Sequence, residues 1–166
     1  EFRRVLFRSG LSFICGLKAP EDLVQIPNTR LLIASGMQAG SGLSLIDTQA
    51  KTARPLFAAG TAAFEANGTR FAGCPAPLDP KAAVLHGLSL RPGVNGNWTL
   101  YATNHGGRES IEVFEVQTNR GTVRTVWVGC VVLPQGLEAN SVAAFTDGTI
   151  VATGLDRKST RLNSSH

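Results

Sequence analysis

Short runs of β-branched and aromatic residues, each bounded by turn-forming residues, cover most of this chain and leave little room for any element but the strand. Runs of about four to eight such residues between Gly, Pro, Asn and Asp are typical of antiparallel β-structure. No segment carries the spacing of an amphipathic helix, and residues 61–66 form at most a turn or two. The sequence therefore predicts an all-β fold. The expected strands are Asp22 to Ile26, Leu31 to Ser35, Leu43 to Asp47, His86 to Leu90, Trp98 to Asn104, Ser110 to Gln117, Thr122 to Val128, Asn140 to Phe145 and Ile150 to Thr153.

Three of these strands begin with a polar residue followed by a similar apolar pattern. Glu21 opens the first, His86 the second and Asn140 the third, so that the starts lie 65 and 54 residues apart. Propeller blades usually repeat every ~40 to 50 residues, so the excess must lie in loops, chiefly an ordered insertion at 58–83. Because a propeller has about four to eight blades, the pattern predicts a partial β-propeller of about two blades and the start of a third.

The two ends of the chain are related to one another at the DNA level. Residues 1–9 can be back-translated into a DNA string whose reverse complement, read one base along, encodes residues 156–164. The string is recognisably a short-read sequencing adapter, so we expect 1–9 and 156–166 to be adapter-derived scars. Residues 10–155 are then the N-terminal part of a longer β-propeller domain.

The net charge of +4 comes entirely from these two ends, because residues 10–155 hold ten basic and ten acidic residues. The charge therefore gives no reason to expect a nucleic-acid partner. The longest apolar stretches, such as 126–133, are far shorter than the ~20 residues of a membrane-spanning helix, so we expect no membrane span. The compartment stays open, with a secreted or periplasmic location favoured.

The polar residues at the strand starts predict a functional site. Equivalent positions of a radial repeat point to one axis, so Glu21, His86 and Asn140 would bring a carboxylate, an imidazole and an amide together. Calcium takes oxygen ligands and suits this set better than zinc does, and a histidine beside the ion can accept a proton from water. Each residue also has a purely structural explanation: an exposed acid at a turn, a buried core histidine, or an asparagine that caps a strand.

Four motifs, taken in order, carry a resemblance to a known family. They are Pro20-Glu21-Asp22-Leu23, His86-Gly87-Leu88-Ser89, Asn104-His105 followed by residues 110–115, and Asn140-Ser141-Val142. Together they resemble the paraoxonase and arylesterase branch of the six-bladed lactonase propellers, near the senescence-marker, gluconolactonase and strictosidine-synthase-like proteins. The likeness spans nearly all of residues 10–155, and it implies a partial six-bladed β-propeller with calcium-dependent esterase or lactonase activity.

The resemblance also implies which residues hold calcium. Glu21 and Asn140 match ligands of a catalytic Ca²⁺ on the axis of the propeller. Asp22 and the backbone carbonyl of Leu88 match ligands of a second, structural Ca²⁺. Ser141 stands where the family carries an aspartate ligand of that second ion, and this departure makes the second site doubtful.

The same resemblance implies a catalytic pair. His86 and His105 match two histidines proposed to activate water in the family, and the substrate would be a small-molecule ester or lactone. The hydrolase would need further ligands beyond residue 155, so we expect this fragment alone to be inactive. The alternative is a non-catalytic propeller, either an interaction platform or a strictosidine-synthase-like relative without esterase chemistry, because a fold does not determine a function.

Three cysteines, Cys15, Cys74 and Cys130, are an odd number without Cys-x-x-Cys spacing, which argues against a zinc ribbon. They are either buried or unpaired thiols, or one of them forms a disulfide with a partner outside this segment.

Two expectations concern charged residues near the third motif. The alternation around Ile111 and Val116 places Glu112 on the solvent side of a half-buried strand. Arg108 and Glu109 are adjacent in a turn, and we expect them to form an exposed ion pair that contributes little to stability.

Overall fold

The structure is a computed structural model that describes residues 12–119 and 121–154. The expected adapter-derived ends, 1–9 and 156–166, lie outside the described residues. Within the described part every regular element is a strand, so the prediction of an all-β fold is confirmed. This part contains no helix that is long and apolar enough to cross a membrane.

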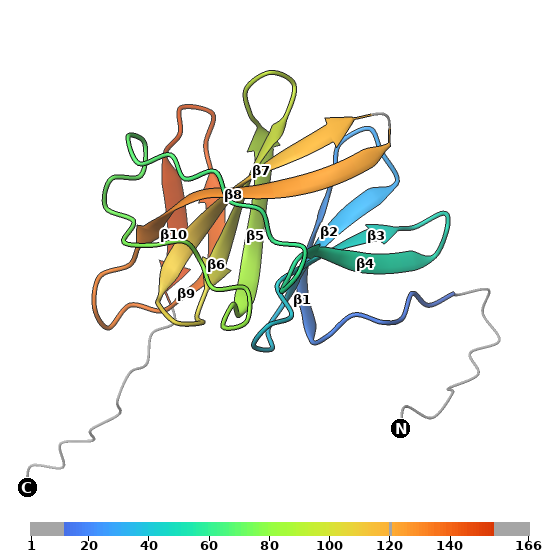
Figure 1. The fold of residues 1–166 in the computed structure, drawn as a ribbon, viewed down its shortest axis with the longest axis horizontal. Coiled ribbons are helices and arrows are strands. Elements are labelled where there is room, and N and C mark those ends of the chain that lie inside the picture. The colour runs from blue at the N-terminus through green and yellow to red at the C-terminus, as the bar shows by residue number, and fades with distance from the viewer. Residues whose placement is uncertain (1–11, 120, 155–166) are drawn as a thin grey trace, which may run out of the picture.

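The described residues form ten strands in three antiparallel sheets, which lie side by side in chain order in Figure 1. The first sheet consists of β1 (Pro20–Gln25), β2 (Leu31–Gly36), β3 (Leu43–Asp47) and β4 (Thr52–Phe57). The second consists of β5 (Leu85–Pro92), β6 (Trp98–Asn104), β7 (Ser110–Asn119) and β8 (Thr122–Val132). The third pairs β9 (Ala139–Ala144) with β10 (Ile150–Gly154).

The first strands of successive sheets are neighbours. Strand β1 packs against β5, and β5 packs against β9. The three strands that open with Glu21, His86 and Asn140 therefore adjoin one another in the order in which they occur in the chain.

Two apolar clusters hold the sheets together. The larger one lies between the first and second sheets and includes Ile33, Leu43, Phe57, Leu85, Leu100, Phe114 and Trp127. Within it the rings of Phe57 and Phe114 meet edge to face, with centroids 4.9 Å apart. The smaller cluster joins Tyr101, Ile111 and Val113 of the second sheet to Ala139 and Val142 of β9. Each large apolar side chain buried in this way contributes about 1.5–3 kcal/mol, so these clusters stabilise the packing of the neighbouring sheets.

The sequence analysis missed β4. Arg54 and Pro55 interrupt the alternation there. Strand β4 is at the edge of its sheet, where a proline is tolerated because its missing N–H is not needed for pairing on the open side.

The insertion at 58–83 lies along β8. The amide of Trp127 donates to the carbonyl of Ala63 at 2.9 Å, and the amide of Asn67 donates to the carbonyl of Val128 at 2.8 Å. A disulfide between Cys74 and Cys130 then fastens the insertion to β8. The expectation of unpaired thiols, or of a partner outside this segment, is therefore wrong for these two residues. Cys15 is free and exposed.

Candidate functional site

Every first strand is irregular at the position of its candidate residue. Glu21 and Asp22 lie in a bulge of β1, His86 and Gly87 in a bulge of β5, and Asn140 in a bulge of β9. A bulge turns a side chain out of the regular alternation of a strand, and bulges are common beside functional sites. The polar strand starts recognised in the sequence thus occupy one equivalent position in each sheet.

A hydroxyl residue on the second strand of each sheet bonds to the backbone of the bulge. The three contacts are the Asp22 amide to Ser35 Oγ (3.0 Å), Thr103 Oγ1 to the Gly87 carbonyl (3.5 Å) and the Ser141 amide to Thr153 Oγ1 (3.1 Å). The sequence analysis missed these hydroxyls. A signal for them was present, because each one stands in a repeated tripeptide: Ala34-Ser35-Gly36, Ala102-Thr103-Asn104 and Ala152-Thr153-Gly154.

Glu21 and His86 meet across the first and second sheets. His86 Nε2 lies 2.7 Å from Glu21 Oε1, and the His86 side chain is only 9% exposed whereas that of Glu21 is 42% exposed. An ionised carboxylate can only accept a hydrogen bond, so Nε2 is the nitrogen that donates in this contact. The Nδ1 atom of His86 is buried and has no hydrogen-bond partner among the described residues.

His105 lies beside His86, directly after β6. The two ring centroids are 5.7 Å apart and the rings are tilted by 54°. Nδ1 of His105 lies 2.8 Å from Glu109 Oε2, while its Nε2 is buried and unpartnered within the described part of the chain. The structure thus brings the two predicted histidines together, each with one nitrogen on a carboxylate and the other buried.

Asp22 links β1 directly to β5. Its Oδ1 accepts a hydrogen bond from the amide of Leu23 at 2.7 Å, and its Oδ2 accepts one from the amide of Leu88 at 2.8 Å. This contact uses the N–H of Leu88, whereas the resemblance implies its carbonyl as an ion ligand. A structural Ca²⁺ at Asp22 stays a prediction.

Gly87 sets the distance between β5 and β9. A Cβ at this position would lie 2.6 Å from Ser141 Cα and 2.7 Å from the Asn140 carbonyl oxygen, so only glycine permits this approach. Asn140 is exposed and Ser141 is half-buried. The backbone of Asn140 therefore lies beside the strand that carries His86, and a shared ion with Glu21 stays a prediction.

A buried asparagine holds the turn that carries His105. Asn104 is 1% exposed, and its Nδ2 donates to the carbonyls of Gly106 and Arg108, both at 2.9 Å. Its Oδ1 accepts hydrogen bonds from the amides of Val84 (3.2 Å) and Gly106 (3.1 Å). The Asn104 side chain thus connects the turn at 106–108 with Val84, the residue that follows the insertion.

Arg108 pairs with Glu112, so the expected pair of Arg108 with Glu109 is wrong. Nε of Arg108 lies 2.9 Å from Glu112 Oε1, and Nη2 lies 3.0 Å from Oε2. Two further donors to the same carboxylate are Ser110 Oγ and Trp127 Nε1, both at 2.6 Å. The expected solvent-facing position of Glu112 is also wrong, since it is fully buried. Both faces of β7 are covered, so the alternation of the strand has no solvent side there.

The oxygen ligands that the resemblance implies are consistent with a hard cation. The Glu21 side chain is 42% exposed and contacts His86 through Oε1, while Asn140 is exposed. Within residues 12–119 and 121–154, no group of three or more His, Cys, Asp or Glu side chains could hold a metal ion. Calcium also uses amide and carbonyl oxygens, so Glu21 and Asn140 remain a chemically suitable pair of ligands.

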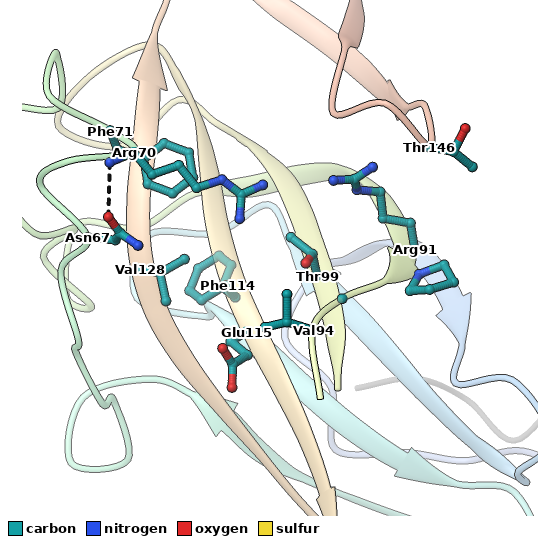
Figure 2. A pocket seen from close by; sticks show the side chains of 12 residues that line it. Asn67, Arg70, Phe71, Arg91, Val94, Thr99, Phe114, Glu115, Val128 and Thr146 are labelled. Atoms are coloured by element: carbon teal, nitrogen blue, oxygen red, sulfur yellow. Dashed lines mark hydrogen bonds between the residues drawn. The ribbon is translucent and has the colours of Figure 1, made fainter. Parts of the chain in front are cut away.

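A pocket of about 390 Å³ lies apart from this site, between the end of β5 and residues 67–71 (Figure 2). Arg70 and Arg91 reach into it from its two sides. The guanidinium of Arg91 lies over the ring of Tyr101, 5.6 Å from its centroid, and donates to the carbonyl of Phe145. Neither histidine of the candidate site lines the pocket.

No protein-family model matches this chain, and no curated protein is found to be similar to it.

Proposed function

We propose that this chain forms the first two blades, and the start of a third, of a six-bladed β-propeller that hydrolyses lactones or aryl esters with Ca²⁺. The observation that carries this proposal is the shared bulge position, which places Glu21, His86 and Asn140 at equivalent points of three adjoining strands. A radial repeat directs such points to one axis, which is where propellers bind their ligands.

Glu21 and Asn140 are the residues that would hold the ion. Bound there, Ca²⁺ would polarise the ester carbonyl and stabilise the oxyanion that forms when water attacks. Asp22 contributes in another way, because its hydrogen bond to the amide of Leu88 keeps β1 and β5 at the spacing that Glu21 and His86 require.

The two histidines would move the proton. Each has a carboxylate on one ring nitrogen, Glu21 on His86 at 2.7 Å and Glu109 on His105 at 2.8 Å. The opposite nitrogens, His86 Nδ1 and His105 Nε2, are the basic atoms, and either can accept a proton from the attacking water. The carboxylate behind each ring favours the imidazolium that forms.

The test uses the full-length protein that contains this chain, with phenyl acetate and a simple six-membered lactone as substrates. We expect hydrolysis that stops in chelator and returns with added Ca²⁺. The variants Glu21→Gln and His86→Gln should lower kcat/KM by about 100- to 10,000-fold, which is the usual contribution of general acid–base catalysis. The exposed acid Glu65 provides a matched control, and Glu65→Gln should leave the rate unchanged.

Rates that do not respond to chelator would exclude the calcium-dependent hydrolase. The alternative, a non-catalytic propeller, is favoured by the fact that the contacts of Glu21 with His86 and of Asp22 with Leu88 also serve as plain cross-links between sheets. In that case both variants would lose stability, and the full-length protein would hydrolyse neither substrate.

The disulfide between Cys74 and Cys130 supports the proposal of an oxidising compartment for this protein. Structural disulfides persist in oxidising environments and are rare in the cytosol. A secreted or periplasmic location is therefore part of the proposal.

A further inference from the structure

The candidate site contains a second carboxylate that neither the motifs nor the resemblance assigns. Glu109 lies just before β7 and contacts Nδ1 of His105 at 2.8 Å. Together with Glu21 and His86 it completes a row of carboxylate, imidazole, imidazole and carboxylate, with the two rings 5.7 Å apart in the middle.

Glu109 can contact His105 because the adjacent Arg108 bonds to other partners. Arg108 directs Nε and Nη2 to Glu112 and Nη1 to the carbonyl of Ala76, at 2.8 to 3.0 Å. Each nitrogen of the guanidinium thus donates to a partner other than Glu109, and the carboxylate of Glu109 contacts the imidazole of His105 instead.

Hydrogen bonds hold the backbone on both sides of His105. Its amide donates to the carbonyl of Val84 at 3.0 Å, and Asn104 bonds to the carbonyl of Gly106 next to it. A Cβ on Gly106 would lie 1.8 Å from the carbonyl oxygen of Ala82, so the turn and the insertion are in direct contact. With the backbone held in this way, the orientation and tautomer of the ring are the properties left for Glu109 to determine.

We propose that Glu109 is a positioning residue for the hydrolytic reaction: by accepting a hydrogen bond from Nδ1 of His105 it holds the ring in the tautomer that keeps a lone pair on the buried, unpartnered Nε2. This inference rests on the proposed function. A carboxylate on one nitrogen of an imidazole fixes the tautomer and makes the other nitrogen more basic, and it stabilises the ring once that nitrogen is protonated.

The first part of the test is kinetic and uses the full-length protein. We expect Glu109→Ala to lower kcat for the lactone by about 10- to 100-fold with KM unchanged, since groups that orient a functional histidine typically have effects of this size. The shorter carboxylate of Glu109→Asp should restore part of the loss. The matched control is Glu115→Gln on β7, because Glu115 accepts hydrogen bonds from Asn97 and Gln117 instead of His105.

The second part is independent of activity and reads the tautomer by ¹⁵N NMR of the histidine-labelled full-length protein. We expect His105 to be protonated at Nδ1 in the parent and in Glu115→Gln, and to exchange between both tautomers in Glu109→Ala. An unchanged tautomer in Glu109→Ala, or an unchanged kcat in an active enzyme, would overturn the positioning role. If the tautomer depends on Glu109 but neither substrate is hydrolysed, the proposed function fails while the control of the ring by Glu109 is supported.

Discussion

Each of the two large sheets has an arginine–carboxylate pair. The N–O distances in the two pairs are nearly the same, but the side chains differ in how deeply they are buried. In the first sheet Arg30 Nε lies 3.0 Å from Asp47 Oδ1, with the two side chains 59% and 21% exposed. In the second sheet Arg108 Nε lies 2.9 Å from Glu112 Oε1, with 18% and 0% exposed. Exposed pairs contribute about 0–1 kcal/mol, whereas removing one partner of a buried pair costs about 3–5 kcal/mol. The distance between the charges therefore says little about their contribution.

The two pairs also differ in what they hold in place. Asp47 accepts hydrogen bonds from the amides of Gln49 and Ala50 and pairs with Arg30, so it connects the turn between β3 and β4 with the residue before β2. Glu112 accepts hydrogen bonds from Arg108, Ser110 and Trp127, and it therefore connects the turn beside His105 with β8. The buried pair therefore supports the candidate site, and the exposed pair supports the turns of the first sheet.

The largest expected effect is that of Glu112→Gln. This change leaves Arg108 without its counter-charge inside the protein, and we expect the free energy of unfolding to fall by about 3–5 kcal/mol in urea melts. Glu115→Gln, three residues along β7, is the control and should change stability by no more than about 0.5 kcal/mol. A similarly small loss for both variants would show that burial does not raise the cost of breaking the pair of Arg108 with Glu112.

Replacing both partners of the buried pair tests whether the unpaired charge causes the loss of stability. We expect this double replacement to lower the free energy of unfolding less than Glu112→Gln does. With Arg108→Met and Glu112→Leu together, no charge is left unpaired, but Trp127 Nε1 and Ser110 Oγ lose their acceptor. We expect a smaller loss than that of Glu112→Gln, because the usual penalty of about 1–3 kcal/mol for each of these two donors is offset by the desolvation cost of the ion pair that the replacement removes. If the double variant were less stable than Glu112→Gln in the same urea melts, the buried charge would not be the dominant cost.

The smallest expected effect belongs to Asp47→Asn. Hydrogen bonds from the Ala50 amide and then from Arg30 hold the pKa of Asp47 below its ordinary value. A lowered pKa stabilises the folded state above the ordinary pKa of an aspartate, about 3.9, and this contribution is lost as the pH falls through the folded-state value. Asp47→Asn should therefore lower Tm slightly near neutral pH and leave it unchanged in strong acid. An equal Tm difference at both pH values would contradict this assignment.

The strands and the strand starts could be predicted because their signals are local. Alternating β-branched residues and turn pairs such as Asn95-Gly96 mark nine of the ten strands to within a few residues. The equivalence of Glu21, His86 and Asn140 also follows from short patterns, which the structure explains by one bulge in each first strand.

The partners of buried polar groups could not be predicted because they come from distant segments. The burial of Glu112 depends on Trp127 of the next strand and on the clusters that cover both faces of β7. The pairing of Cys74 with Cys130 depends on how the insertion crosses β8. For Glu109 the nearest opposite charge in the sequence is Arg108, and only the buried position of Glu112 shows why that pair does not form.

The most direct test of the central claim is the anomalous diffraction signal of calcium in crystals of the full-length protein. We predict one ion bound by the carboxylate of Glu21 and the amide oxygen of Asn140, with the rings of His86 and His105 lining the same cavity. An ion bound elsewhere, or an Asn140 side chain directed away from Glu21 with calcium present, would contradict the account.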